Sequence, residues 1–155
     1  MEAAKTEHPE ANGPARQGGD ASARLVLESL RVERDRVVAM VRVEDAAYAM
    51  TTPQIARAAT QARPDLPQHA CVNGVGPVFG AVMANTPLPH LLEHVVVDLQ
   101  AAACPDPDRV FTGVTRWTDR RAGKARVEVS YADDIVALRA FRDAVLLVNS
   151  LDEGK

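Results

Sequence analysis

The sequence contains few cysteines and no long apolar run, and these two shortages exclude whole classes of protein. Only two of its 155 residues are cysteine, Cys71 and Cys104, and they do not form a C-x-x-C pair. This spacing predicts two reduced, partly buried thiols instead of a disulfide framework or a cysteine zinc knuckle. No apolar stretch approaches the roughly 20 residues that a membrane-spanning helix needs.

A secretory signal and a general excess of positive charge are also missing. The first ten residues, MEAAKTEHPE, contain no apolar core of the kind that a signal peptide requires. The net charge is -3 and the pI is near 5.8, which excludes the long-range field of a general nucleic-acid or anionic-membrane binder. The basic cluster at residues 116–126 could bind an acidic chain or nucleic acid, but we expect it to be a solvated hairpin turn. We therefore expect a cytoplasmic protein with neither a nucleic-acid nor a membrane partner; no feature indicates its oligomeric state.

Composition divides the chain into tails and one domain. Residues 1–23 are rich in Ala, Gly, Glu and Pro and have no periodic apolar positions, which predicts a disordered N-terminal tail. The chain is 46% hydrophobic and long enough for one core of ordinary size. We expect a single domain over residues 24–151, followed by a short C-terminal tail at 152–155.

Apolar periodicity predicts four strands and three helices. Strand-like apolar patterns bounded by turn residues occur in four segments: 24–32, 36–43, 110–117 and 125–131. Helical spacing of apolar residues occurs in three: 53–62, 87–103 and 134–148. The resulting order ββααββα predicts an α+β fold, a two-layer sandwich with a mainly antiparallel sheet and the helices packed on one face.

Local residue signals support the helix boundaries. A threonine directly before a proline, at Thr52 and again at Thr86, is typical of a helix start. Either Asp133 or Asp134 is expected to cap the last helix. Residues 64–80 carry many prolines and glycines and are expected to form a loop. The core-facing side of the last helix is predicted to contain five apolar residues: Ile135, Leu138, Phe141, Val145 and Val148.

The sequence HLLEH at residues 90–94 carries the sharpest chemical signal. His90 and His94 lie one helical turn apart, so their imidazoles can converge on one ion. Glu93 flanks them at the spacing for activating water, as in the H-x-x-E-H inverted-zincin pattern. Because zinc polarises carbonyls and acidifies water, the motif predicts a zinc site with Glu93 as general base.

Two questions stay open at this point. The same residues could be solvated side chains on the polar face of an amphipathic helix. A catalytic zinc also needs a third protein ligand, and Asp98 is a poor candidate because eight residues of straight helix span about 12 Å. We expect the ligand to come from elsewhere, first from Asp134 and then from Asp133, Glu128 or His69.

The motif lies among other recognisable segments. Residues 90–100, HLLEHVVVDLQ, are preceded by LPQHACVNGVGPVF at 66–79 and followed by FTGVTR at 111–116 and VEVSYADD at 127–134. Taken together, these segments resemble the N-terminal domain of cyanophycin synthetase. They are similar to that family's H-x-x-E-H-x-x-x-E-L-Q helix, its histidine-x-cysteine and glycine-rich loop, and two of its strands. The resemblance covers about residues 24–151.

The resemblance implies two functions. The family's N-terminal domain holds a growing polymer of arginine and aspartate, and in some members it carries a zinc-peptidase site that trims the polymer into primers. By position, His90 and His94 would be metal ligands, Glu93 the general base, and Asp134 the third ligand. Polymer synthesis is not implied, because the chain stops where the family's ATP-grasp and ligase domains would begin.

Departures from the family pattern keep a second hypothesis open. Gln68 and Ser130 stand where the family has acids, and Asp98 is shorter than the expected glutamate. The intact H-x-x-E-H motif favours a stand-alone zinc-dependent hydrolase acting on amide bonds of a charged peptide or arginine-aspartate polymer. The replaced acids favour a non-catalytic polymer- or protein-binding or regulatory module without a working metal site. An interaction domain with unrelated partners is a third interpretation.

Overall fold

The computed structural model describes residues 23–151, and the elements follow the predicted order ββααββα. The strands are β1 (Leu25–Val32), β2 (Arg36–Val43), β3 (Gly113–Asp119) and β4 (Lys124–Ser130). The helices are α1 (Pro53–Ala62), α2 (Leu88–Ala103) and α3 (Asp134–Ser150), with short 3-10 turns η1 (Ala46–Tyr48), η2 (Leu66–Gln68) and η3 (Phe79–Ala81). The tails expected at 1–23 and 152–155 lie outside the described residues, apart from Ala23.

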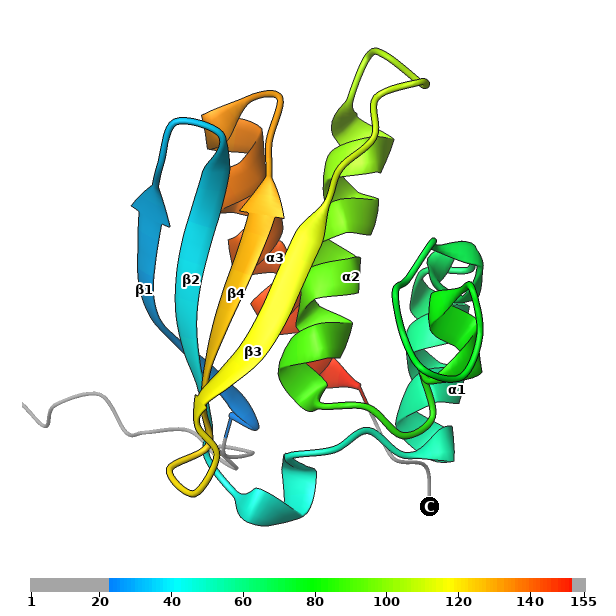
Figure 1. The fold of residues 1–155 in the computed structure, drawn as a ribbon, viewed down its shortest axis with the longest axis vertical. Coiled ribbons are helices and arrows are strands. Elements are labelled where there is room, and N and C mark those ends of the chain that lie inside the picture. The colour runs from blue at the N-terminus through cyan, green and yellow to red at the C-terminus, as the bar shows by residue number, and fades with distance from the viewer. Residues whose placement is uncertain (1–22, 152–155) are drawn as a thin grey trace, which may run out of the picture.

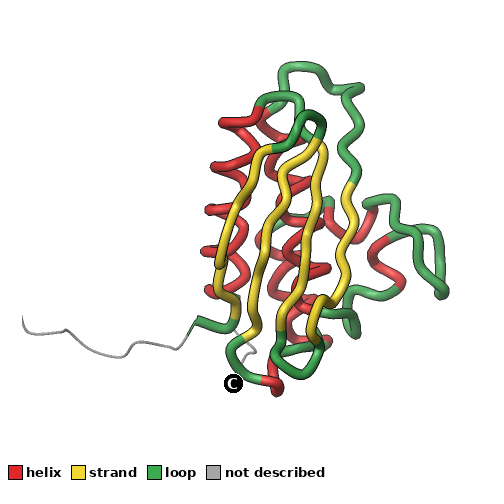
Figure 2. Tube along the Cα trace, turned by 60° about the vertical axis from the view of Figure 1, so that its left-hand side comes forward, coloured by secondary structure: helices red, strands yellow, loops and turns green. Residues whose placement is uncertain are grey.

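The four strands form one antiparallel sheet in the order β1-β2-β4-β3. α2 and α3 pack against each other and against the same face of the sheet, which gives the predicted two-layer α+β sandwich (Figures 1 and 2). α1 lies beside α2, beyond the edge formed by β3 (Figure 1). Within residues 23–151, no helix combines the length and the apolar character needed to cross a membrane.

The core forms where the alternating strands meet the helices. Val37 and Val41 of β2, like Val127 and Val129 of β4, are at most 1% exposed, because every second side chain of these strands faces the helical layer. The core-facing side of α3 differs from the prediction at Ile135, which is 53% exposed in the first turn. Three smaller residues of α3 are buried in the core as well: Ala137, Ala140 and Ala144.

Two helix caps follow the sequence signals and one does not. The Thr52 side chain accepts a backbone hydrogen bond at the start of α1, and the Asp133 side chain accepts two at the start of α3. Thr86 was expected to cap α2, but Pro87 occupies the cap position without a side-chain hydrogen bond. The hydroxyl of Thr86 instead lies 2.8 Å from Nδ1 of His90. Thr86 therefore contacts a histidine of the candidate site instead of capping α2.

Candidate metal centre

The polar face of α2 is buried, so the interpretation of these residues as solvated side chains does not hold. Glu93 is 5% exposed, His94 6% and Asp98 7%. β3 packs along one side of the helix, and the loop that contains η2 and η3 covers another. Burial of ionisable groups is costly unless they are paired or hydrogen-bonded. The partners of these side chains therefore define the site.

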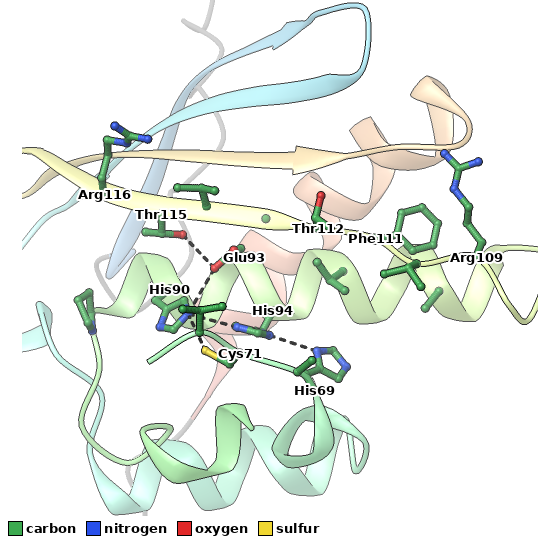
Figure 3. A pocket seen from close by; sticks show the side chains of 18 of the residues that line it. His69, Cys71, His90, Glu93, His94, Arg109, Phe111, Thr112, Thr115 and Arg116 are labelled. Carbon is green, nitrogen blue, oxygen red and sulfur yellow. Dashed lines mark hydrogen bonds and ion pairs between the residues drawn. The ribbon is translucent and has the colours of Figure 1, made fainter. Parts of the chain in front are cut away.

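Three side chains converge on one point of α2: Cys71, His90 and His94 (Figure 3). Nε2 of His90 lies 3.2 Å from Nε2 of His94, and Sγ of Cys71 lies 3.6 Å from Nε2 of His90. One ligand atom from each residue lies within 4.8 Å of the other two. The two histidines come from successive turns of α2, and the loop between η2 and η3 brings the cysteine to them.

Two of the spacings in this group match those of a tetrahedral zinc site. Typical zinc–nitrogen and zinc–sulfur bonds put neighbouring ligand nitrogens about 3.3 Å apart and a nitrogen about 3.6 Å from a sulfur. The distances of 3.2 Å and 3.6 Å in this group agree with both values. Thiolate and imidazole donors are also ligands that zinc prefers. Cys71, His90 and His94 could therefore hold a zinc ion.

Glu93 lies beside this group with its carboxyl group between α2 and β3. Its Oε2 is 3.4 Å from Nε2 of His90 and accepts a hydrogen bond of 3.3 Å from the hydroxyl of Thr115. Burial raises the pKa of Glu93 to about 7, against the smaller opposing effect of the Thr115 hydrogen bond. A carboxyl group with such a pKa can both take up and release a proton near neutral pH.

The two histidines are held in the neutral form that binds metal ions. Burial lowers the pKa of His90. The pKa of His94 falls to about 3, mainly through burial and further through repulsion from His90 and His69. Neutral imidazoles have a free nitrogen lone pair at neutral pH, so a metal ion need not displace a proton from either ring.

A hydrogen-bonded chain of Asp98, His69 and His94 continues behind the group. Oδ1 of Asp98 lies 3.1 Å from Nε2 of His69, and Nδ1 of His69 lies 3.2 Å from Nδ1 of His94. Asp98 also pairs with Arg63. Burial alone would raise the pKa of Asp98, but the hydrogen bonds from His69 and Arg63 outweigh burial and lower it.

The ionised Asp98 determines which ring nitrogens carry protons. A carboxylate only accepts, so Nε2 of His69 donates to Asp98, and in the neutral ring Nδ1 of His69 is left as an acceptor. Nδ1 of His94 must then donate to His69, which leaves the Nε2 lone pair of His94 pointing at His90. Second partners of this kind orient metal-binding histidines. Thr86 occupies the equivalent place on Nδ1 of His90.

Phe79 fixes the two imidazole rings by packing. Its ring stacks on that of His94 with centroids 3.9 Å apart and an angle of 20° between the planes. It meets the ring of His90 edge-on at 5.1 Å and 84°. Phe79 is fully buried at the start of η3. The loop that carries Cys71 therefore also supplies the ring that packs on both histidines.

The expected third ligand, Asp134, lies elsewhere. It is exposed in the first turn of α3, which begins beside the C-terminal end of α2, whereas both histidines are in the first half of α2 (Figure 1). Of the other candidates, Asp133 caps α3 and Glu128 forms ion pairs with two arginines on the sheet face opposite the helices. His69 contacts His94 but is not one of the three converging ligands.

Cys71 was expected to be an ordinary reduced thiol, and its place beside the two histidines was not predicted. The available signal was the H-A-C spacing at residues 69–71, within the segment that resembles the family's histidine-x-cysteine loop. The structure shows that its two outer residues contact the two histidines of α2. His69 contacts His94, and Cys71 contacts His90 (Figure 3).

An open groove of about 830 Å³ runs past the group. Its walls are residues 109–117, which include most of β3, and residues 69–72 of the loop, and α2 forms the floor (Figure 3). Cys71, His90, Glu93 and His94 all line it. A groove of this volume can admit an extended peptide segment to the candidate metal centre.

Comparison with known protein families finds a match whose range includes the candidate metal centre. The sequence matches the cyanophycin synthase-like N-terminal domain over residues 37–153, which is more than half of the chain. The chain belongs to this family. The predicted resemblance is therefore confirmed, and the match includes the converging ligands and Glu93. A search of curated proteins finds no match.

Proposed function

We propose that this domain is a zinc-dependent hydrolase that cleaves amide bonds in a charged peptide or in an arginine-aspartate polymer. One observation carries the proposal: Cys71, His90 and His94 converge within 4.8 Å beside the buried carboxyl group of Glu93, on the floor of an open groove. This arrangement supplies a ligand set, a general base and access for a polymeric substrate.

The side chains suit amide hydrolysis. Zinc, when bound, would supply the Lewis acidity that polarises a carbonyl group and acidifies water. Oε2 of Glu93 is placed to accept the proton of the attacking water and to pass it to the leaving amine, because its pKa of about 7 permits both transfers. Thr115 holds this carboxyl group by its hydroxyl. His69 and Phe79 keep His94 in one orientation.

The groove supports a substrate that carries negative charge. Arg109 and Arg116 line its two ends, and Glu93 is the sole acidic residue among the described residues that line it (Figure 3). Substrate carboxylates would therefore meet favourable charge at both ends. A polymer of arginine and aspartate, the substrate class implied by the family, has such carboxylates.

The alternative of a binding module rests on the two replaced acids. Gln68 is exposed, and the hydroxyl of Ser130 accepts a hydrogen bond from the amide of Thr112. Neither residue belongs to the converging group. These replacements leave its three ligands in place, so the hydrolase is the better-supported function.

The decisive experiment is to measure zinc per chain in protein purified without chelator. We expect close to one zinc ion per chain, and its loss in the double variant His90→Ala, His94→Ala. Glu93→Gln should keep the zinc and lose hydrolysis of arginine-aspartate polymer, because Glu93 acts as base and not as ligand. Absence of zinc even after zinc is added back would contradict the proposal and favour the binding module.

A further inference from the structure

β3 is an edge strand, and its free side faces the groove. One side of β3 pairs with β4, while the sheet order leaves the other side without a neighbouring strand. The groove is lined without interruption by residues 109–117. An edge strand presents a row of main-chain donors and acceptors that can pair with another polypeptide.

The ladder to β4 identifies which residues use their main-chain groups within the sheet. The amide of Ser130 donates to the carbonyl oxygen of Thr112 at 2.8 Å, so these residues form a hydrogen-bonded pair. In an antiparallel ladder such pairs alternate along the strand. By this alternation, Val114 and Arg116 also direct their main-chain groups at β4.

The intervening residues therefore direct their amides and carbonyl oxygens at the free edge. They are Gly113, Thr115 and Trp117. No residue in the described part of the chain forms a hydrogen bond with these main-chain groups on that side. Each of them presents one amide donor and one carbonyl acceptor. These pairs of groups recur at every second residue, which is a spacing of about 7 Å along the strand. A polypeptide main chain in extended conformation has the matching repeat.

We propose that an extended polypeptide segment with acidic side chains binds in the groove as an additional strand on β3. This inference rests on the proposed function and names how its substrate is held. The segment pairs through its own main chain with Gly113, Thr115 and Trp117, as in strand-addition complexes. The groove wall of nine residues offers room for a segment of about eight.

Thr115 links this pairing to the reactive group. Its main-chain groups face the free edge, and its hydroxyl donates to Oε2 of Glu93 at 3.3 Å. Gly113, two residues away on the same edge, lies against the carboxyl group of the same glutamate. An amide bond of the segment that pairs at Thr115 therefore lies beside Glu93. Strand addition places the bond to be cleaved without a pocket for any particular side chain.

Charge and apolar surface define the side chains of the segment. Arg109 and Arg116, at the two ends of the groove, attract carboxylates. Val72 and Val110 line the groove and are exposed, so aliphatic side chains of the segment can pack against them. A segment that alternates acidic and aliphatic residues satisfies both features.

The test uses an acetylated and amidated octapeptide of alternating aspartate and valine as the probe. Hydrogen exchange of backbone amides is followed by NMR in the full chain, with chelator present so that the probe is not cleaved. Bound probe should slow exchange about tenfold or more at Gly113, Thr115 and Trp117. Val114 and Arg116, whose amides are directed at β4, should change little. This alternation would not arise from binding by charge alone.

Two matched comparisons sharpen the test. Two probes are N-methylated at every second residue, one at the amides that face β3 and the other at the remaining amides. The first should bind about tenfold more weakly than the unmethylated probe, and the second should bind about equally well. Arg116→Gln should weaken binding, while Arg121→Gln, in the turn between β3 and β4, should not. Uniform protection, or equal effects of both N-methylated probes, would overturn the inference.

The remaining outcomes separate this inference from the proposed function. Zinc binding and hydrolysis without alternating protection would retain the hydrolase and overturn strand addition. Alternating protection by the probe in chelated protein would support strand addition even if no zinc is ever bound. Protection of the same three amides without probe, rising with protein concentration, would assign the edge to a second copy of the chain and overturn the inference.

Discussion

Gly113 of β3 lies directly against the carboxyl group of Glu93, with no space for a side chain between them. A Cβ atom added to Gly113 would come within 2.7 Å of Cγ and 2.8 Å of Cδ of Glu93. Real Cβ atoms essentially never show such distances. Glu93 can reach the candidate metal centre in its present orientation only because residue 113 is glycine.

Gly113→Ala is therefore expected to displace Glu93 and to reduce hydrolysis about a hundredfold, since a shift of about 1 Å in a reacting group can cost that much. Zinc content should stay unchanged, because Gly113 contacts none of the three ligands. Initial rates at saturating zinc provide the measurement. Gly74→Ala is the matched control, since a Cβ there meets no atom within 4 Å; similar losses in both variants would refute the interpretation.

Cys71→Ser tests the third ligand. Substitution of an outer hydrogen-bond partner typically costs 10- to 100-fold in metal affinity, so loss of a direct ligand should cost about a hundredfold or more. Competition with a chromophoric chelator measures the affinity. Cys104→Ser, which changes the other half-buried cysteine, should bind zinc like the unaltered protein. Equal affinity of the two variants would remove Cys71 from the ligand set.

Asp98→Asn tests the chain of hydrogen bonds behind His94. An asparagine amide can donate as well as accept, so it no longer forces Nε2 of His69 to carry the proton. His94 is then less strictly kept in the tautomer whose Nε2 is free to bind zinc. Zinc affinity should therefore fall about tenfold. Asp98→Glu should restore much of that loss, because it keeps the negative charge. A change in thermal stability without any change in zinc affinity would show that Asp98 serves only packing and pairing with Arg63.

The buried Glu93 predicts a specific pH dependence of stability in chelated protein. Its pKa is about 7 in the folded state against 4.5 for an ordinary glutamate, so its contribution is fully present below pH 4.5 and is lost as pH rises through 7. Relative to Glu93→Gln, the unaltered protein should lose on the order of 2 kcal/mol of unfolding free energy between pH 5 and 8. Urea unfolding across that range measures the difference. A constant difference would contradict the raised pKa.

Local sequence information was sufficient for most element boundaries. Thr52 and Asp133 cap helices where expected, and the hairpin strands and α1 follow the predicted ranges within a residue or two. β3 begins at Gly113, three residues later than predicted, because the preceding apolar residues line the groove outside the sheet. The exposed position of Ile135 shows the same limit: periodicity identifies a helix face, but the neighbouring elements decide how much of it they cover.

The sequence by itself determined that His90, Glu93 and His94 share one region of a helix, because spacing within a helix follows from its 3.6-residue period. Only the tertiary structure decided what completes that site. Cys71 is 19 residues from His90, and Thr115 is 22 residues from Glu93, so their contacts depend on how the loop and β3 pack around α2. The same packing buries a helix face that its sequence presents as polar, and it leaves the free edge of β3 open to the groove. These are non-local properties, which periodicity and capping residues do not encode.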